Sequence, residues 1–574
     1  MDSLEALLTA PGAPFAVERG EDGGLAYAEG PRTLREFAET TWAFGDTPFL
    51  IAETGRLTYG EFFAAACALA RRFLDPGEGG YGLRPGDRAV IAMRNHPEWQ
   101  VAFWAAQLAG LVAVPLNSWW TADEFAYALD DCEPGVLLVD GERYERVAPW
   151  LDAAGRGGEG GRRPWTLVFH DGGRSVGGAR VERYVDLPPA DPQLGPPDID
   201  VQPDWDATIL YTSGTTGRPK GAVATHHAHM GAIANPRYFA ALSSLGRGQI
   251  PGQGPVPVGL LTFPFFHVAA FTGFYGAMAA GGTLVLLRKW DPDAALAAIR
   301  DHGVAAFGGV PTTALQLLAR AAELGDPLPT LTMFNTGGAA APAHLVGRLT
   351  DHYGERIEPR NGYGLTETLG GVTANFGDQY RRWPASVGRP APAVETRIAG
   401  PDGTPLPDGE IGELWLRGQC LVRGYWRDPA ATEAAFTPDG WFRTGDLATS
   451  ADGRISVVDR IKDMVIRGGE NVYCVEVESC LHDHPDVLEA AVVGVPHPEL
   501  GEEVAALIRT RPGSDLTAEA VRAFAAKTLA AFKVPAHVLL QETELPRNAT
   551  GKVLKRDVRA SVTRARPRPS PSGD

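Results

Sequence analysis

Strand and helix signals alternate over residues 57–170, and this alternation constrains the fold more than any other feature of the chain. Three short apolar runs predict buried strands, at 88–93, 111–116 and 135–140. Thr58 and Thr121 each precede a glutamate three residues later, which is the capping-box pattern that begins a helix, and residues 97–109 predict another helix. Because strands separated by helices of this length form βαβ units, we expect an α/β fold with a mostly parallel sheet.

The C-terminal part of the chain has a different pattern. After Asp463, short β-rich segments at 490–495 and 504–509 and one helix at 517–531 predict a small α+β domain of about a hundred residues. The last stretch, 563–574, is rich in proline, serine and arginine and predicts a disordered tail. We expect surface loops where glycine, arginine and proline concentrate, at 155–163, 171–180 and 244–259.

Charge and cysteine content exclude several classes of function. A net charge of −17 without any basic block argues against nucleic-acid binding, so local donors must hold an anionic ligand. The five cysteines lie far apart without a C-x-x-C pair, which excludes a disulfide scaffold or zinc ribbon and indicates a reduced, cytoplasmic setting. The N-terminus shows no signal peptide, and no apolar run approaches the roughly 20 residues that span a bilayer. Peripheral membrane contact and a homodimer stay open.

Residues 211–222, YTSGTTGRPKGA, predict a loop that wraps polyphosphate. Glycine N–H groups can approach an anion closely, hydroxyl groups add donors, and a lysine adds a positive charge. The candidate ligands are Thr212, Ser213, Gly214, Thr215, Thr216, Gly217 and Lys220. The loop differs from the P-loop of NTPases, because the fifth residue after Gly214 is Pro219, which has no N–H to donate. A flexible polar loop without a ligand is the alternative.

Further motifs follow along the chain: FPFFHVAAF at 263–271, NGYGLTET at 361–368, Thr-Gly-Asp at 444–446, DRIKDMVIRGGENVY at 459–473 and PRNATGKVLK at 546–555. With these motifs the chain resembles the acyl-adenylate-forming superfamily, which holds acyl-CoA synthetases, firefly-type luciferases and the adenylation domains of peptide synthetases. The chain looks most like a bacterial fatty-acyl-CoA synthetase. The resemblance implies a large, multi-layered α/β domain with mostly parallel sheets at 1–460 and a small, mobile α+β domain at 461–562.

The resemblance assigns residues 361–368 to ATP and magnesium. Tyr363 offers an aromatic face to adenine, Thr366 can hydrogen-bond the α-phosphate, and Glu367 holds Mg²⁺ together with Thr212. Further nucleotide contacts are implied for Asn361, Gly362 and Gly364, and for the adenine-pocket loop of Gly337, Gly338 and Ala339. A tight strand-to-helix turn with a surface glutamate is the alternative.

Two later motifs supply the ribose contact and the catalytic lysine. A carboxylate accepts both hydroxyls of a ribose, so Asp446 is the candidate, and Arg460 should reach the ribose or a phosphate. By resemblance, Lys552 is the catalytic lysine of adenylation and acts with Thr366 and Glu367. Its ammonium would bridge the substrate carboxylate and the α-phosphate oxygens as charge develops there. A turn aspartate and an exposed terminal lysine are the alternatives.

The same resemblance implies two half-reactions, namely formation of acyl-AMP from ATP and then transfer of the acyl group to the CoA thiol. Lys462 falls on the pivot about which the small domain turns between them, with Asp463 as the neighbouring alternative. The segment that would lie along pantetheine is matched by Gly468, Gly469 and Glu470. The residues after 560 contain no carrier-domain segment, so the acceptor is free CoA or a separate carrier protein.

The acyl pocket is assigned by resemblance to residues 263–271 and their surroundings. The implied pocket residues are Phe266, His267, Val310 and Gly338. A core histidine bonded to backbone is the alternative for His267. Amino-acid-activating relatives place an aspartate in the 263–271 stretch, and none is present here, so an amino-acid substrate is disfavoured.

A fatty acid is the expected substrate, and an aryl acid such as a coumarate or benzoate is the second candidate. A luciferase-type oxygenase is supported by no positive feature of the sequence. A nucleotide-binding regulator without catalysis is a different class of function, and the intact Glu367, Asp446 and Lys552 argue against it.

Overall fold

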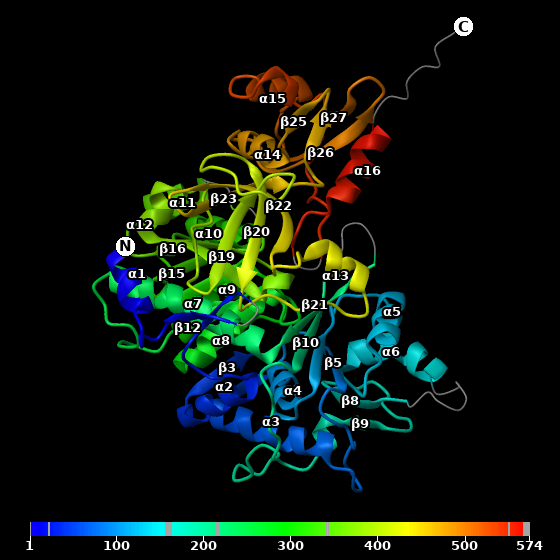
Figure 1. Cartoon of the computed structure of the whole chain (residues 1–574). Coiled ribbons are helices and arrows are strands. Elements are labelled where there is room, and N and C mark those ends of the chain that lie inside the picture. Colours follow the sequence, from blue (N-terminus) through cyan, green and yellow to red (C-terminus); the bar gives the residue numbers. More distant parts are fainter. Residues whose placement is uncertain are drawn as a thin grey trace.

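Two mixed sheets with mostly parallel strands form most of the large N-terminal domain (Figure 1). The computed structural model describes residues 2–20, 23–154, 163–212, 218–339, 341, 344–548 and 551–565. The first sheet has eight strands, in the order β21 (Gly424–Tyr425), β11 (Gly221–Thr225), β10 (Asp206–Tyr211), β6 (Val112–Pro115), β5 (Arg88–Ala92), β7 (Val136–Asp140), β8 (Trp165–Phe169) and β9 (Val181–Arg183). Its strands from β10 to β9 pair in parallel, whereas β11 pairs with β10 and β21 in antiparallel register.

The second sheet has nine strands, and its central part is parallel. The strand order is β18 (Arg389–Pro390), β17 (Gly370–Phe376), β16 (Glu358–Leu365), β15 (Met333–Thr336), β14 (Ala306–Gly309), β12 (Val258–Leu261), β13 (Thr283–Leu286), β3 (Pro48–Ala52) and β4 (Gly55–Thr58). Strands β16 to β3 are parallel, and hairpin partners at each edge are antiparallel.

Three helical layers cover the faces of these two sheets. The layer between them shares one core with both sheets and contains α2 (Leu34–Thr41), α3 (Tyr59–Leu74), α4 (Pro97–Leu108), α7 (His226–Gly246) and α8 (Val268–Ala280). The outer face of the first sheet packs against α5 (Ala122–Cys132) and α6 (Gly141–Ala154). The outer face of the second packs against α9 (Pro292–His302), α10 (Pro311–Leu324) and α11 (His344–Tyr353). Apolar runs without alternation become the central strands because both of their faces are covered.

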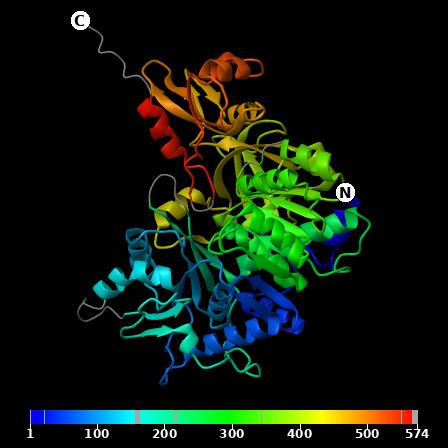
Figure 2. The same cartoon turned by 180° about the vertical axis from the view of Figure 1, so that it is seen from behind.

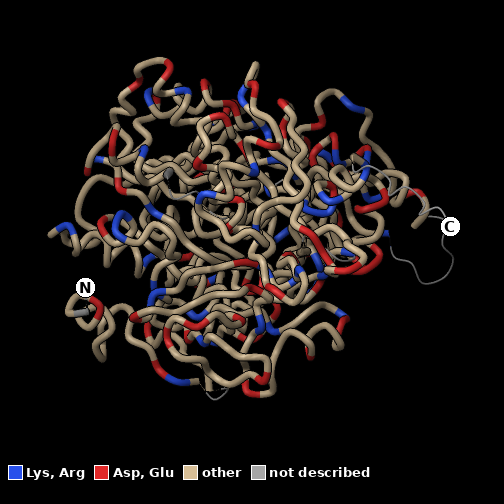
Figure 3. Tube along the Cα trace, turned by 90° about the horizontal axis from the view of Figure 1, so that it is seen from above, with Lys and Arg blue, Asp and Glu red and all other residues tan. Residues whose placement is uncertain are grey.

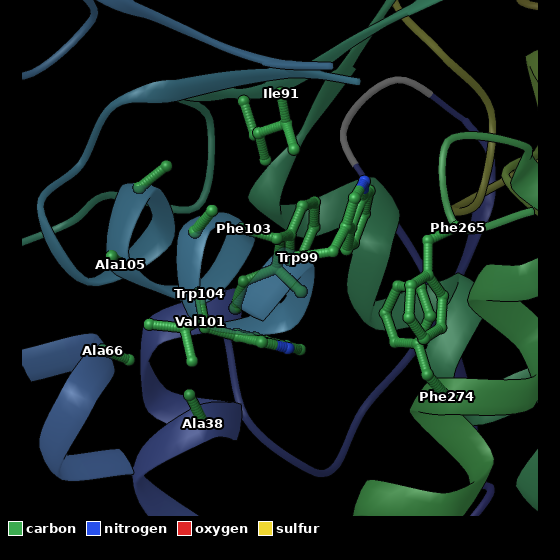
Figure 4. Packing of buried hydrophobic residues seen from close by; sticks show 14 of the residues in the cluster. Ala38, Ala66, Ile91, Trp99, Val101, Phe103, Trp104, Ala105, Phe265 and Phe274 are labelled. Carbon is green, nitrogen blue, oxygen red and sulfur yellow. The ribbon is translucent and has the colours of Figure 1, made fainter. Parts of the chain in front are cut away.

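Helix α4 is apolar on nearly all sides because it lies between the two sheets and contacts strands of both. Trp99, Phe103 and Trp104 are completely buried in the shared core (Figure 4). The Trp99 ring lies 5.1 Å from the ring of Phe265, and the Phe103 ring lies 5.9 Å from that of Phe274. These contacts pack Phe265 and Phe274 against helix α4, although the two segments are far apart in sequence.

A third, antiparallel sheet connects the large domain to the small one. Its order is β19 (Val394–Ala399), β20 (Gly412–Gly418), β22 (Phe442–Ala451) and β23 (Arg454–Arg460). The remaining elements of the large domain are α1 (Asp2–Thr9), β1 (Val17–Arg19), β2 (Leu25–Tyr27), η1 (Trp42–Phe44), η2 (Tyr184–Asp186), η3 (Thr366–Thr368), α12 (Gly377–Arg382) and α13 (Pro429–Ala435). Strand β23 ends at Arg460, directly before the predicted start of the small domain at 461.

The small domain lies at one end of the molecule in both opposite views (Figures 1 and 2). Its sheet has the order β25 (Glu470–Val472), β24 (Val465–Arg467), β27 (Gly501–Thr510) and β26 (Val487–His497), and β28 (His537–Gln541) pairs in parallel with β27. Its helices are α14 (Cys474–His482), α15 (Ala518–Ala525), η4 (Ala531–Lys533) and α16 (Lys555–Ala565). Separate apolar clusters on its two faces give it a core of its own.

The expected fold class is confirmed, with mostly parallel sheets in a large domain and a small α+β domain. Both capping boxes are present, with Thr58 and Thr121 as the capping residues. The three strands predicted in the first part of the chain and both strands of the C-terminal part form, each within a few residues of the expected bounds. The exact domain boundaries stay predictions.

Some expected boundaries were wrong. The helix expected at 517–531 ends at Ala525, because the chain turns there and brings Leu529 onto the core of the small domain. Helix α7 extends into the loop expected at 244–259 and ends at Gly246. Residues 563–565 belong to helix α16 and not to a tail. The loop at 171–180 is confirmed, whereas most of 155–163 and all of 566–574 lie outside the described residues.

Acidic and basic residues are interspersed along the chain when the molecule is seen from above (Figure 3). Residues of both signs are thus mixed in this view, although the whole chain carries a net charge of −17. None of the helices in the described ranges combines the length and apolar character needed to cross a membrane.

Candidate active site

The base of the predicted phosphate loop is an antiparallel pair formed by β10 and β11. The Thr212 N–H donates to the Lys220 carbonyl at 2.8 Å, so the two ends of the loop are held together. The Lys220 ammonium lies 3.7 Å from Asp428 Oδ2 and 5.4 Å from the centre of the Tyr425 ring. The other predicted loop ligands, Ser213, Gly214, Thr215, Thr216 and Gly217, lie outside the described residues.

Glu367 lies where the two large sheets approach each other. Strand β16 of the second sheet leads into the short helix η3, which carries Thr366 and Glu367. The hydroxyl of Tyr425, on the edge strand β21 of the first sheet, donates to Glu367 Oε1 at 2.7 Å. Burial and the Glu367 carboxylate both raise the pKa of Tyr425. Since the same tyrosine ring faces Lys220, the structure brings the ends of the 211–222 and 361–368 motifs together.

The residue types at this junction suit a magnesium site to which a nucleotide's phosphates would add further ligands. The described residues contain no group of three or more His, Cys, Asp or Glu side chains that could hold a metal ion. Mg²⁺ bound with a nucleotide takes one or two protein oxygens, several waters and phosphate oxygens, so a single carboxylate fits that mode. Glu367 and Thr212 therefore stay predicted metal ligands.

Asp446 is buried, with 2% of its surface exposed, and is held by two predicted nucleotide residues. Tyr363 donates its hydroxyl to Asp446 Oδ2 at 2.6 Å, and Arg460 Nε lies 2.8 Å from Asp446 Oδ1. Asp446 and Arg460 are also direct partners in the β22–β23 ladder. Burial, followed by the negative charge of Asp446, raises the pKa of Tyr363. The second sheet and the third sheet thus meet at one carboxylate.

Two glycines of the nucleotide motifs lie in different surroundings. A Cβ on Gly364 would lie 1.8 Å from the Gly370 carbonyl oxygen, so the close turn between β16 and β17 requires glycine there. A Cβ on Gly338, where φ is +76°, would lie 3.7 Å from Val310 and 3.8 Å from Phe263. The adenine-pocket loop therefore borders the predicted acyl pocket.

Three other predicted nucleotide residues belong to the same strands and loop. Gly337 donates its N–H to the Gly309 carbonyl at 3.3 Å, and Asn361 is the β16 partner of Thr336 at the end of β15. A Cβ on Gly362 would lie 3.0 Å from the Thr373 carbonyl oxygen of β17. Ala339 is exposed beside Gly338.

Lys552 reaches the large domain from the small one. The neighbouring Gly551 lies close to Val310, a predicted acyl-pocket residue at the start of helix α10, since a Cβ on Gly551 would lie 3.3 Å from Val310 Cγ2. The Lys552 backbone is held by Asn548, whose side chain accepts from its N–H at 2.9 Å. Lys552 is an exposed residue, but the surrounding protein desolvates its ammonium in part and lowers the pKa of Lys552 to about 8. The positive charges of Arg460 and Lys462 lower this pKa as well, whereas Asp446 and Asp463 act in the opposite direction.

His267 lies close enough to Lys552 to sense its charge, and Phe266 is its neighbour in the chain. His267 caps helix α8 by accepting the Ala269 N–H on Nδ1 at 3.2 Å, and burial together with Lys552 lowers its pKa to about 4. A neutral imidazole therefore stands beside the catalytic-lysine candidate. Phe266 meets the ring of Trp119 edge-on at 5.5 Å.

Sequence reasoning missed four residues of this region. Trp119 follows strand β6, and its 38% exposure is high for a tryptophan; the Trp-Trp pair directly after a predicted strand was the available signal. The Arg94 guanidinium covers it at 4.4 Å. Asn95 accepts from Phe265 N–H at 2.8 Å and donates to the Phe263 carbonyl at 2.9 Å, so it clamps the acyl segment. Tyr425, the partner of Glu367, carried no sequence signal.

The hinge and the predicted pantetheine segment take separate places. Lys462 stands in the turn after β23, where burial and Arg460 lower its pKa. Gly468, Gly469 and Glu470 form the exposed end of the β24–β25 hairpin, and Gly468 donates its N–H to the Leu500 carbonyl at 2.8 Å within the small domain. The arrangement described here therefore presents Lys552, and not this hairpin, to Asp446 and His267.

Comparison with known proteins shows the family to which the chain belongs. Residues 37–426 match the family described as AMP-binding enzyme, and residues 476–552 match the AMP-binding enzyme C-terminal domain. A feruloyl-CoA synthase from Amycolatopsis is 36% identical over 505 residues, which cover 88% of this chain and 93% of the relative. A long-chain-fatty-acid–CoA ligase from Mycobacterium tuberculosis is 32% identical over 517 residues, covering 89% and 94%.

The fold agrees with a solved structure of the same kind. The o-succinylbenzoate–CoA synthetase of Bacillus subtilis, in complex with its acyl-adenylate intermediate, superposes with a TM-score of 0.72 and 26% identity, covering 94% of this chain and 99% of that one. With both domains matched and the relatives covered almost completely, the chain belongs to the AMP-binding enzyme family and is an AMP-forming acyl-CoA synthetase, an acid–thiol ligase.

Proposed function

We propose that this enzyme activates an apolar carboxylic acid with ATP and Mg²⁺ and transfers the acyl group to CoA, with Lys552 as the catalytic residue of the first half-reaction. The observation that carries this proposal is the position of Lys552 among Asp446, Arg460 and His267. Asp446 and Arg460 would hold the ribose, and Tyr363 and residues 337–339 the adenine. The Lys552 ammonium would then neutralise charge where the acid attacks the α-phosphorus.

The phosphates and their cation would lie between the two large sheets. Lys220, Thr366 and the 212–217 loop would bind phosphate oxygens, and Glu367 and Thr212 would hold Mg²⁺. The cation would supply charge neutralisation on the departing pyrophosphate. The Tyr425–Glu367 hydrogen bond supports this role, because it orients the carboxylate toward the same junction as Lys220.

The second half-reaction would follow a turn of the small domain about Lys462. The exposed 468–470 hairpin would replace Lys552 at the site and lie along the pantetheine of CoA. Its exposure in the present arrangement supports this proposal, because a segment that docks in another arrangement must be free to leave its present surroundings. We take 461 as the first residue of the small domain, and a separate carrier protein is the alternative acceptor.

Two classes of acid are candidates for the substrate. We place a medium- or long-chain fatty acid first, because the pocket residues Phe266, Val310 and Gly338 offer a surface without an ionisable side chain. The aryl acid is favoured by a specific finding, the 36% identity to a feruloyl-CoA synthase against 32% to the fatty-acid ligase. Trp119 beside Phe266 would suit a planar ring as well as a chain.

The test is carboxylate-dependent release of pyrophosphate from ATP–Mg²⁺, with and without CoA. The panel holds short, medium and long fatty acids, coumarate, ferulate, benzoate and amino acids. We expect turnover stimulated by CoA with fatty or aryl acids. Release that CoA does not stimulate would point to a carrier protein, and no release with any acid would overturn the proposed function. We further propose a cytoplasmic location. On the same preparation, size-exclusion chromatography tests for a homodimer and sedimentation with lipid vesicles tests for peripheral membrane contact.

A further inference from the structure

A partly buried charge network begins three residues after the catalytic-lysine candidate. Lys555 follows Lys552 by three residues and is the first residue of helix α16. Its ammonium lies 3.0 Å from Glu478 Oε1 on helix α14, and 22% and 19% of these two side chains are exposed. The same Glu478 oxygen accepts the Val492 N–H at 2.8 Å. Glu478 therefore connects Lys555, at the end of the loop that carries Lys552, to strand β26 of the small domain's sheet.

The network continues across the hinge to Asp459, which is 3% exposed and is the next-to-last residue of strand β23. One carboxylate oxygen of Asp459 accepts the N–H of Arg460 at 2.8 Å. Its other oxygen, Oδ2, accepts the N–H of Cys474 at the start of helix α14. Because both oxygens accept backbone N–H groups, an asparagine at 459 could satisfy just one of them.

The charges of this network depend on one another. Burial raises the pKa of Asp459 and of Glu478, and the Lys555 ammonium opposes that rise in both. Burial acts against the charge of Lys555, but Glu478, with Asp459 and Asp463, more than offsets it and raises the pKa of Lys555. Removing one member therefore leaves the others buried without compensation.

The members of the network stand on opposite sides of the pivot. Asp459 precedes Lys462 and belongs to the third sheet of the large domain, whereas Cys474, Glu478 and Lys555 follow it. A rigid turn of the small domain about Lys462 would carry the Lys555–Glu478 pair along unchanged. The same turn would separate Asp459 from the Cys474 N–H, because the pivot lies between them in the chain.

We propose that Asp459, Glu478 and Lys555 are positioning residues for acyl-adenylate formation. Asp459 holds the small domain in the arrangement that brings Lys552 to Asp446, and the Lys555–Glu478 pair fixes the loop that carries Lys552. The choice of adenylation as the affected half-reaction rests on the proposed function. The contacts of Asp459, Glu478 and Lys555 do not, because they exist in the protein without substrates. On this proposal Asp459 acts in adenylation alone, because its hydrogen bond to the Cys474 N–H would be lost when the small domain turns.

The kinetic test separates the two half-reactions. Adenylation is measured as acid-dependent exchange of pyrophosphate into ATP without CoA, and the second step as thioester formation from CoA and the synthetic acyl-adenylate. Asp459→Asn and Lys555→Met should each slow adenylation by about tenfold, the scale for losing a hydrogen bond to a charged group, and leave thioester formation within about twofold. Lys555→Arg should restore most of the adenylation rate.

The matched control is Lys533→Met. Lys533 also pairs with a glutamate of helix α14, Glu476, at 2.8 Å, and it is 21% exposed, but this ion pair does not include Asp459, Glu478 or Lys555. Lys533→Met should leave the ratio of the two half-reactions unchanged. If Asp459→Asn and Lys555→Met slow both half-reactions equally, or if the control changes the ratio as much as they do, the positioning role is wrong.

Hydrogen–deuterium exchange of the full chain tests the same assignment without any substrate. Asp459→Asn should speed exchange in the peptides that contain Cys474 and residues 547–555 by about tenfold, while Lys533→Met should not. Unchanged exchange in Asp459→Asn would overturn the inference whatever the enzyme's activity. Faster exchange combined with a wild-type protein that activates no acid would instead count against the proposed function alone.

Discussion

The hydroxyl of Tyr363 lies 2.6 Å from Asp446 Oδ2, although the two residues are 83 positions apart in the chain. One comes from the second sheet and the other from the third, so this hydrogen bond joins two layers at the proposed nucleotide site. Asp446 is thereby oriented by Tyr363 on one oxygen and by Arg460 on the other before any ligand binds. Such preorganisation lowers the cost of binding a ribose.

Replacing Tyr363 with phenylalanine tests this relationship. The variant keeps the ring for adenine but loses the hydrogen bond that orients Asp446, so we expect the KM for ATP to rise by about three- to tenfold with little change in kcat. Asp446→Asn should raise it further, because it weakens the contacts of both Tyr363 and Arg460. Steady-state pyrophosphate release at varied ATP gives both constants. A larger fall in kcat than rise in KM would contradict a binding role.

Lys552→Ala should abolish one half-reaction and spare the other. Loss of the charge that meets the α-phosphate should slow adenylation by about a hundredfold or more, whereas conversion of supplied acyl-adenylate and CoA to thioester should continue. Pyrophosphate exchange and thioester formation are assayed separately. Lys527→Ala is the control, because Lys527 lies on the small domain beside Phe524. Equal loss of both half-reactions would argue against the assigned role.

The pKa of about 8 for Lys552 predicts the pH dependence of adenylation. The ammonium form is the active one and is complete well below that pKa, so kcat/KM for pyrophosphate exchange should fall as the pH rises through about 8. CoA is left out, because its thiol ionises in the same range. In Lys552→Arg, whose guanidinium stays charged, the residual activity should lose this alkaline fall. An unchanged profile in that variant would assign the fall to another group.

The core between the two large sheets should be sensitive to truncation. Phe274 is completely buried against Trp99, Phe103 and Phe265, and Phe274→Ala should reduce the free energy of unfolding by about 3–5 kcal/mol. Leu324→Ala, at a position 53% exposed on helix α10, should change it by less than about 0.5 kcal/mol. Urea unfolding followed by tryptophan fluorescence compares the two. Similar losses in both would show that the contacts of Phe274 do not limit stability.

Many helices and strands of this fold follow from local signals in the sequence. The capping boxes at Thr58 and Thr121 form because a threonine and a glutamate three positions later satisfy each other's backbone N–H groups without help from distant residues. The apolar runs of β5, β6 and β7 form strands because they are short and lie between helices. Motif order alone was enough to predict Asp446 and Arg460 as neighbours of the nucleotide, and the β-ladder places them side by side.

Tertiary structure decided the rest, because it depends on contacts between segments with no local signal for one another. Trp119 next to Phe266, Asn95 clamping residues 263–265, and Tyr425 on Glu367 each join chain segments more than fifty residues apart. The helix expected at 517–531 ends early because the core of the small domain draws Leu529 inward. The sequence by itself determined the elements and the chemistry of the motifs. Packing across the sheets determined which motifs face one another, since burial and charge pairing act through space and not along the chain.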